Sequence, residues 1–192
     1  MSESVFIALV SALSGFIVAF LAQPVKTYVQ NRAKLKNLRI ALYKEMSINY
    51  SVLNTLTPDD YSTFEWGGNN PAYALRTECY KHALETEIST FYQMNEANLI
   101  NLLMGACILH IIEGFKHLRN LSEEQLSKDL PRYTESYLNN STNFKDVYAA
   151  SFYGGLFDRK ILTDIIQQPT YENIMKRGKE YSEKRVSEQA KH

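Results

Sequence analysis

The sequence predicts an all-α protein, in which a single N-terminal transmembrane helix precedes a cytosolic helical bundle. The first observation is an apolar run without any charged residue between Glu3 and Lys26. The second is that apolar residues recur at helical spacing through most of the remaining chain, and no stretch shows the alternation of a strand. We therefore divide the chain into a transmembrane helix (1–25), a juxtamembrane basic helix that continues into the bundle (26–56), and a cytosolic helical domain (57–192).

The N-terminal run is long enough to cross a membrane. At 1.5 Å per residue, residues 4–25 would form a helix of about 33 Å, against a hydrocarbon core of about 30 Å. A cleaved signal peptide would have a positive start, a shorter apolar core and a small-residue cleavage site. The segment before this run carries only Glu3, and the run itself is longer. These features favour a retained helix over a cleaved one.

A basic cluster follows the apolar run and predicts its orientation. Its members are Lys26, Arg32, Lys34, Lys36 and Arg39. Residues 1–44 carry six bases and one acid, whereas the remainder carries 15 bases and 20 acids. The positive-inside rule then places the N-terminus outside and the rest of the chain in the cytoplasm. Contact with anionic lipid explains the cluster, and contact with nucleic-acid phosphates is an alternative.

Small residues recur along the N-terminal helix with the 3.5-residue period of a left-handed coil. They are Ala8, Ala12, Gly15, Ala19 and Ala22. In lipid, small residues let helices approach closely, so we interpret this seam as a contact between copies of the chain. The abundance of Ala and Gly in membrane helices is the alternative explanation. The seam does not distinguish a dimer from a ring that encloses a pore.

The cytosolic part is expected to hold four to six helices. Leu38, Leu42, Met46 and Leu53 mark the buried stripe of the first, which follows an interruption or kink at Pro24. Tyr43, Glu45 and Asn49 are expected to form a hydrogen-bonded edge of the core. The expected helices cover 25–56, 71–94, 95–120, 144–166 and 171–192. A short helix is also expected to start at residue 57, and another at Ser122, which Pro131 interrupts. We expect a polar loop at 139–143 and a loosening of the helix 144–166 at Gly154-Gly155.

The most apolar stretch of the cytosolic part is residues 99–112. It could be a second spanning helix, but it is only 14 residues long and contains Asn101 and His110. Because a span needs about 20 apolar residues, we expect a buried central helix instead.

Few residues indicate catalytic or metal chemistry. Cys79 and Cys107 lack metal-type spacing and are expected to be buried thiols. His110, Glu113 and His117 share a helix face that a metal would accept, but their surroundings favour a core histidine and a surface histidine. We expect no cofactor and no metal, and infer no small-molecule substrate.

Two Arg–His pairs could act on a phosphodiester, with a cation for the phosphate and an imidazole for proton transfer. Arg76 precedes His82 by six residues, and Arg185 precedes His192 by seven. On one helix, the six-residue offset rotates about 240° and separates the pair, whereas the seven-residue offset brings both to within about 20°. Geometry therefore favours the second pair, although His192 ends the chain.

The membrane helix, the helical domain and the divergent R-x(4–6)-H motif together resemble the HEPN-like membrane accessory protein of type VI-B CRISPR systems. The resemblance implies a HEPN-like fold and a ring-shaped homo-oligomer, an octamer in the family, that forms a pore in the bacterial inner membrane. It also implies enhancement of antiphage defence by an RNA-guided CRISPR ribonuclease, with that ribonuclease or its RNA products as partners.

The motif departs from that of active HEPN ribonucleases. In active members a polar residue often follows the arginine of the motif. Here Thr77 follows Arg76 and Val186 follows Arg185, and neither matches that residue cleanly. This departure favours a structural motif over a catalytic one. The alternatives are a membrane-tethered HEPN-type ribonuclease and a membrane-anchored scaffold that recruits a soluble partner.

Overall fold

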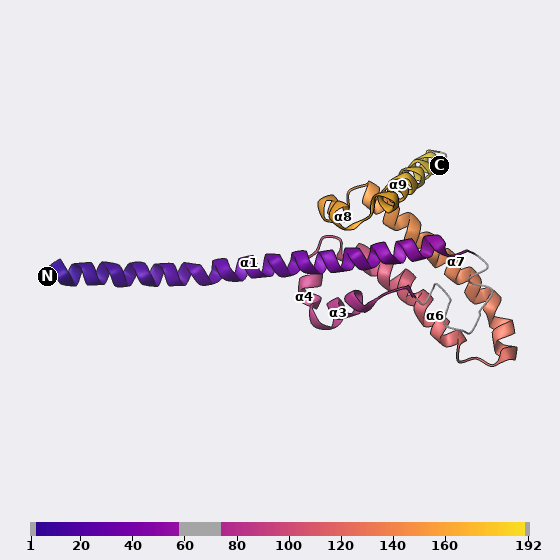
Figure 1. The fold of residues 1–192 in the computed structure, drawn as a ribbon, viewed down its shortest axis with the longest axis horizontal. Coiled ribbons are helices and arrows are strands. Elements are labelled where there is room, and N and C mark those ends of the chain that lie inside the picture. The colour runs from indigo at the N-terminus through magenta and orange to yellow at the C-terminus, as the bar shows by residue number, and fades with distance from the viewer. Residues whose placement is uncertain (1–2, 58–73, 191–192) are drawn as a thin grey trace.

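A computed structural model describes residues 3–57 and 74–190, with the side chains of 3–10, 17, 19 and 21 excluded. Every described element is a helix, which confirms the all-α class. The longest is α1 (Glu3–Thr55), whose N-terminal half projects from the other helices as a straight rod, with the N-terminus at its far end (Figure 1). We call residues 3–34 the stalk and the remaining described residues the bundle.

The bundle contains the C-terminal part of α1 and a series of helices that pack around it. These are α3 (Glu78–Thr86), α4 (Ile88–Phe91), α5 (Ala97–Ile100), the π-helix η2 (Asn101–Leu109), α6 (His110–Leu118), α7 (Glu123–Tyr153), α8 (Arg159–Ile165) and α9 (Gln168–Gln189). The N-cap Ser122 forms a capping box with Gln125, as the sequence indicates for the start of α7.

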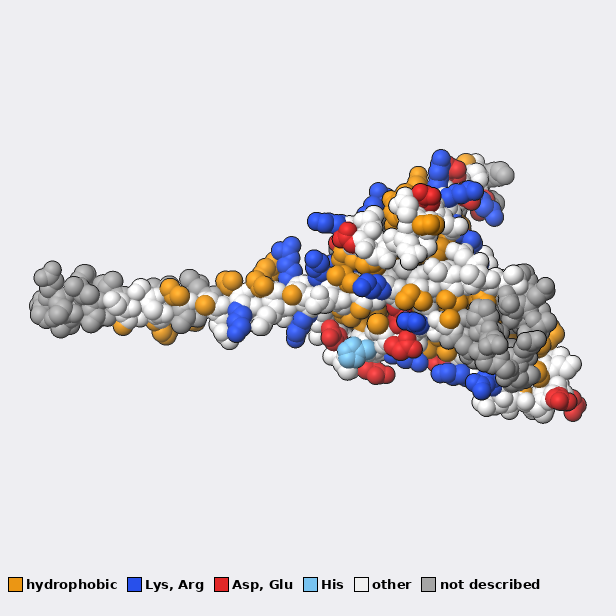
Figure 2. Space-filling model, viewed as in Figure 1, with side chains coloured by type: hydrophobic (Ala, Val, Ile, Leu, Met, Phe, Trp, Pro, Cys, Tyr) orange, Lys and Arg blue, Asp and Glu red, His pale blue; other side chains and the backbone are white. Residues whose placement is uncertain are grey.

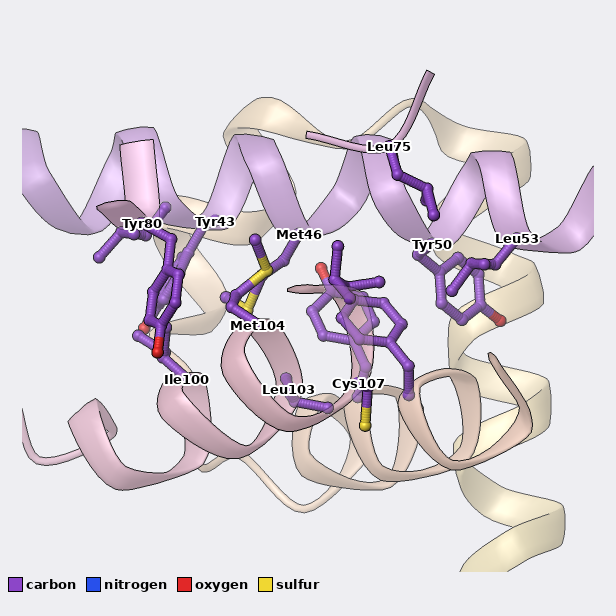
Figure 3. Packing of buried hydrophobic residues seen from close by; sticks show 14 of the residues in the cluster. Tyr43, Met46, Tyr50, Leu53, Leu75, Tyr80, Ile100, Leu103, Met104 and Cys107 are labelled. Carbon is purple, nitrogen blue, oxygen red and sulfur yellow. The ribbon is translucent and has the colours of Figure 1, made fainter. Parts of the chain in front are cut away.

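The core is assembled between α1 and the continuous segment α5–η2–α6. Met46, Tyr50 and Leu53 of α1 face Leu103 and Cys107 of η2 (Figure 3). The α1 stripe predicted from helical spacing is buried, with Leu42, Met46 and Leu53 fully inaccessible. Burial of this stripe is the main force that holds α1 in the bundle, since each fully buried large apolar side chain contributes about 1.5–3 kcal/mol.

The central segment 97–118 is the one helix among the described residues that is long and apolar enough to cross a membrane. Ile100, Leu103, Met104, Ile108 and Ile111 are nevertheless fully buried against neighbouring helices. This burial confirms the expected central core helix. The N-terminal transmembrane helix stays a prediction.

Two predicted proline breaks are wrong. Pro24 lies inside α1, and Pro131 lies inside α7. A proline removes one backbone hydrogen bond, and helix propagation on both sides of it offsets that local cost in these helices of 53 and 31 residues.

The predicted polar loop at 139–143 is also wrong, because α7 runs through it. Tyr137, Ser141, Phe144 and Tyr148 recur at helical spacing across this stretch and are buried. Packing of that stripe outweighs the low helix propensity of the neighbouring asparagines.

The predicted helix 71–94 is shorter and divided. Helix α3 begins only at Glu78, and a break at Glu87 separates it from α4. Residues 75–77 are not helical, because the Asn49 side chain accepts from the Arg76 N–H and donates to its carbonyl, at 2.8 Å each. These bonds occupy the backbone groups that a helix would use. The short helix expected from residue 57 lies outside the described residues.

At the C-terminal end, α7 stops at Tyr153 and Gly155 adopts φ +74°, a left-handed conformation that glycine tolerates best. The sequence predicts only a loosened helix at Gly154-Gly155, whereas in the structure the helix ends there and a turn leads into α8. Helix α9 then packs closely on α7, since a Cβ built on Gly178 would stand 2.3 Å from the Ala149 carbonyl oxygen. Pro169 lies in the first turn of α9, as expected.

Candidate functional site

The stalk is a helix with an apolar N-terminal part and extends beyond the bundle. Every described side chain from residue 11 to residue 34 is exposed. Large apolar side chains are among them, with Phe16 exposed by 69%, Val18 by 67% and Phe20 by 68%. The rings of Phe16 and Phe20 stack on each other at 6.2 Å between centroids. Exposed apolar surface of this extent is typical of a partner or membrane contact.

The described members of the small-residue seam are all accessible. Ala12, Gly15 and Ala22 are exposed, and a Cβ built on Gly15 would meet nothing within 4 Å. Ala8 and Ala19 belong to the same helix, but their side chains lie outside the description. A second helix could therefore reach the middle of the seam without displacing any described side chain.

The basic cluster lies where the stalk meets the bundle, and Figure 2 shows its side chains gathered on that junction. Lys26, Arg32, Lys34 and Lys36 are exposed. Arg39 differs from these four, because its Nε lies 2.5 Å from Oε1 of Glu96 in an ion pair. We define the collar as the four exposed members and treat Arg39 as part of the junction.

The junction is held by a buried polar network. The Tyr43 hydroxyl donates to Oε1 of Glu96 at 2.5 Å and accepts from the Asp158 N–H at 3.1 Å. Arg39 completes it with two hydrogen bonds to the Glu96 carboxylate. The network therefore joins α1 to the turn before α5 and to the start of α8.

The network also shifts two acid–base equilibria. Burial raises the pKa of the Tyr43 hydroxyl, and Glu96 raises it further. Burial lowers the pKa of Arg39, but the hydrogen bond and charge of Glu96 outweigh this effect and raise it above its usual range. Both groups therefore keep their protons at neutral pH.

The structure places the first Arg–His pair at the start of α3. Arg76 precedes the helix with an exposed side chain, and His82 is exposed on the helix. The 240° rotation expected for one continuous helix therefore does not apply to this pair. His82 contacts Thr86 at 3.1 Å through Nε2. In the second pair, Arg185 lies 6.0 Å from the Tyr181 ring centroid, and His192 is outside the described residues.

Glu45 is a buried carboxylate that fixes the start of α3. It is 3% exposed and accepts the N–H groups of Cys79 and Tyr80, at 2.9 Å each. Together with the Asn49 bonds, this confirms the hydrogen-bonded core edge expected on α1. Burial raises the pKa of Glu45 above its ordinary value near 4.5, against the two N–H bonds that lower it.

We expect Glu45→Gln to destabilise the bundle by about 1–2 kcal/mol, because an amide nitrogen cannot accept one of the two N–H bonds. The difference in the free energy of unfolding between wild type and this variant should be largest near pH 4 and should become smaller as the pH rises. Since the folded pKa is raised, wild type loses stability as Glu45 ionises above about pH 4.5, and glutamine does not titrate. Urea unfolding from pH 4 to 7 measures this effect. Glu85→Gln, at an exposed α3 position, is the control, and a loss that widens with pH would contradict the assignment.

The remaining predicted positions are separate from the junction. His110 is exposed with Nε2 3.2 Å from the Ser136 hydroxyl, and the ring of His117 lies 5.6 Å from that of Tyr133. Within the described ranges, no group of three or more His, Cys, Asp or Glu side chains is arranged to hold a metal. Cys107 is buried, which raises the pKa of its thiol to about 11, while Cys79 is only half-buried.

Comparison with protein-family models, with curated proteins and with solved structures gives no match to this chain. The features of the chain that bear on its function are therefore the stalk, the collar and the junction.

Sequence reasoning missed the role of the junction. The sequence pattern assigns Arg39 to the basic cluster and gives no indication of a role for Glu96. All four members of the network are more than 50 residues apart in sequence from at least one partner. The sequence offers one weak indication of this role. Arg39 follows Leu38 of the apolar stripe and precedes Leu42 and Tyr43, so it borders the buried face of α1.

Proposed function

We propose that the protein is an oligomeric membrane effector, in which stalks from several copies insert in the bilayer, associate and form a pore. The single observation that carries this proposal is the stalk itself, a helix with an apolar N-terminal part whose described side chains are all exposed. The proposal includes the predicted topology, with the bundle in the cytoplasm of a bacterial cell and the N-terminus on the outer side of the inner membrane.

The order of features along α1 supports insertion. The apolar part of the stalk comes first, the exposed collar follows, and the bundle begins at residue 35. Aromatic Tyr28 is 65% exposed next to the collar. Apolar core, interfacial aromatic and cytoplasmic cations occur in this order in single-span membrane proteins. Exposure of Phe16 and Phe20 to water would be unfavourable by several kcal/mol, which lipid would remove.

The seam supports association of the stalks. Helices in lipid gain little from apolar bulk, because lipid tails are equally apolar, and instead associate through close packing at small residues. The accessible positions at Ala12, Gly15 and Ala22 offer such a surface. A ring of stalks joined along both sides of the seam would enclose a channel, and a closed pair would not.

The resemblance to the HEPN-like accessory of type VI-B CRISPR systems supports the biological setting. We propose that the pore perturbs the inner membrane and enhances RNA-guided antiphage defence, with the CRISPR ribonuclease or its RNA products as the activating partner. The all-helical bundle is compatible with a HEPN-like fold, and the Arg–His pairs in this proposal are structural.

A seam variant tests this function. We expect Ala12→Leu combined with Gly15→Leu to reduce the oligomer to monomers and to abolish dye leakage from liposomes containing phosphatidylglycerol. The reason is that two added isobutyl groups hold neighbouring helices apart at the close contact. Mass photometry in detergent measures assembly, and release of a trapped fluorophore measures the pore.

Ser11→Leu combined with Ser14→Leu is the matched control, because it adds leucines at the same three-residue spacing, each displaced about 100° around the helix from Ala12 and Gly15 respectively. Both serines are exposed, and their one described side-chain bond is local, from the Ser14 hydroxyl to the Ser11 carbonyl. The control should keep its oligomer and its leakage. A monomeric, non-leaking wild type would overturn the proposed function, and equal effects of both variants would overturn the seam.

A further inference from the structure

A cleft of about 530 Å³ lies at the junction, between the collar side of α1 and helix α8. Its α1 wall includes Tyr28, Arg32 and Lys36, and its α8 wall includes Lys160 and Ile161. Cations and apolar groups therefore face the same space from two elements that are more than 120 residues apart in sequence.

We propose that this cleft binds the headgroup of an anionic phospholipid, with the phosphate held between α1 and α8. The proposal rests on membrane insertion of the stalk. It goes beyond the collar as a diffuse positive surface, because it assigns a bounded site to which α8 contributes a charge.

The lining of the cleft carries a net positive charge, which favours an anion. Arg39 also lines the cleft, but its charge is compensated by Glu96. Asp158 lines it too, and its carboxylate accepts the N–H groups of Lys160 and Ile161 at the start of α8. With Arg39 paired to Glu96, the cations of Arg32, Lys36 and Lys160 face the carboxylates of Asp158 and Asp164, which leaves one net positive charge in the cleft.

The end of the cleft nearest the apolar run lies at the level of the headgroup layer. If Val25 ends the apolar run, Tyr28 lies about 5 Å beyond it and Arg32 about 10 Å along the helix. The headgroup region extends about 5–8 Å beyond the hydrocarbon on each side. Lysine side chains from Lys36 and Lys160 can extend toward the same level with their apolar stems against the protein.

The chemistry of the lining also fits a lipid better than a free anion. Tyr28 and Ile161 give the cleft an apolar side, and Val29 on the same wall is 58% exposed. A glycerophospholipid presents a phosphate next to glycerol carbons and acyl chains, so both parts of the lining would be in contact. A soluble phosphate would use only the cations.

The test compares two double variants of the full-length protein in nanodiscs. Lys36→Gln with Lys160→Gln removes two cleft cations, and Lys26→Gln with Lys34→Gln removes two exposed lysines outside the cleft. Native mass spectrometry then measures retention of phosphatidylglycerol relative to phosphatidylcholine. We expect the cleft variant to lose about tenfold or more of its selectivity, since each lysine near an anionic surface contributes about 1 kcal/mol.

The control lysines are closer to the apolar run than Lys36, so a diffuse electrostatic attraction predicts at least as great a loss in the control variant. Equal losses, or no preference for phosphatidylglycerol in wild type, would overturn the site. Addition of inorganic phosphate should leave lipid retention unchanged, and displacement of the lipid by phosphate would overturn the lipid assignment.

Flotation with phosphatidylcholine vesicles separates this inference from the proposed function. Wild type and both variants should float, because insertion depends on the stalk. If wild type does not float, membrane insertion itself fails. If all three float equally and show no lipid selectivity, only the cleft assignment fails.

Discussion

Replacing Phe16 and Phe20 together by lysine is expected to release the protein from membranes. A lysine at the centre of a membrane helix costs about 2.5–3.5 kcal/mol, so the pair should cost about 5–7 kcal/mol. Each 1.4 kcal/mol is tenfold, so partition into vesicles should fall more than a thousandfold. Vesicle flotation measures the partition. The bundle should keep its thermal transition, because neither ring contacts it and their one described aromatic contact is with each other.

The matched control places two lysines on exposed apolar positions of the bundle. Leu156 is 64% exposed and Val186 is 67% exposed, close to the values at Phe16 and Phe20. The double lysine variant at these sites should float as wild type does. A stalk variant that also floats would show that the stalk is not the membrane anchor.

The second large effect is expected at the junction, where Glu96→Ala should destabilise the bundle by about 3 kcal/mol. The Glu96 side chain is 5% exposed and that of Arg39 is 21% exposed, so removal of the carboxylate leaves a largely buried guanidinium without its partner. The Tyr43 hydroxyl also loses its acceptor at 2.5 Å. Urea unfolding of the full chain in detergent, followed by circular dichroism, measures the loss.

Two further variants identify the cause. Glu113→Ala removes an exposed acid from α6 and should change stability by less than about 0.5 kcal/mol. Arg39→Met combined with Glu96→Leu removes both charges and should recover most of the loss, because the cost of Glu96→Ala is that of an uncompensated cation. If the double variant were less stable than Glu96→Ala, the ion pair would be a source of net stability.

The sequence predicted the parts of the fold that depend on local periodicity. The α1 stripe from Leu38 to Leu53, the central helix and the start of a helix at Ser122 were all accessible to such reasoning, because each depends on residues close together in one helix. The interruptions of helices were predicted less well. Pro24, Pro131 and the asparagines near residue 140 are unfavourable locally, and packing or propagation along long helices overrides them.

The opposite error occurred before α3. The chain there looks helical from its composition, but Asn49 and Glu45 bind its backbone from another helix, and a pattern of single residues does not reveal such a partner. The junction was missed for the same reason. Its members are ordinary charged and aromatic residues whose meaning depends on contacts between distant segments, whereas the stalk and collar were found because their signal is contiguous.

The continuity of α1 constrains how copies can assemble. Helix α1 runs from the stalk into the bundle without interruption, so the two parts would turn and tilt together in the proposed oligomer. The bundle is much wider than the stalk (Figure 1), and a bare helix is only about 10 Å across. Copies that touched through their bundles with upright α1 helices would leave their stalks apart. Stalks in contact along a left-handed seam must instead lean toward a common axis and cross at about 20°, so the assembly would taper toward the outer face of the membrane.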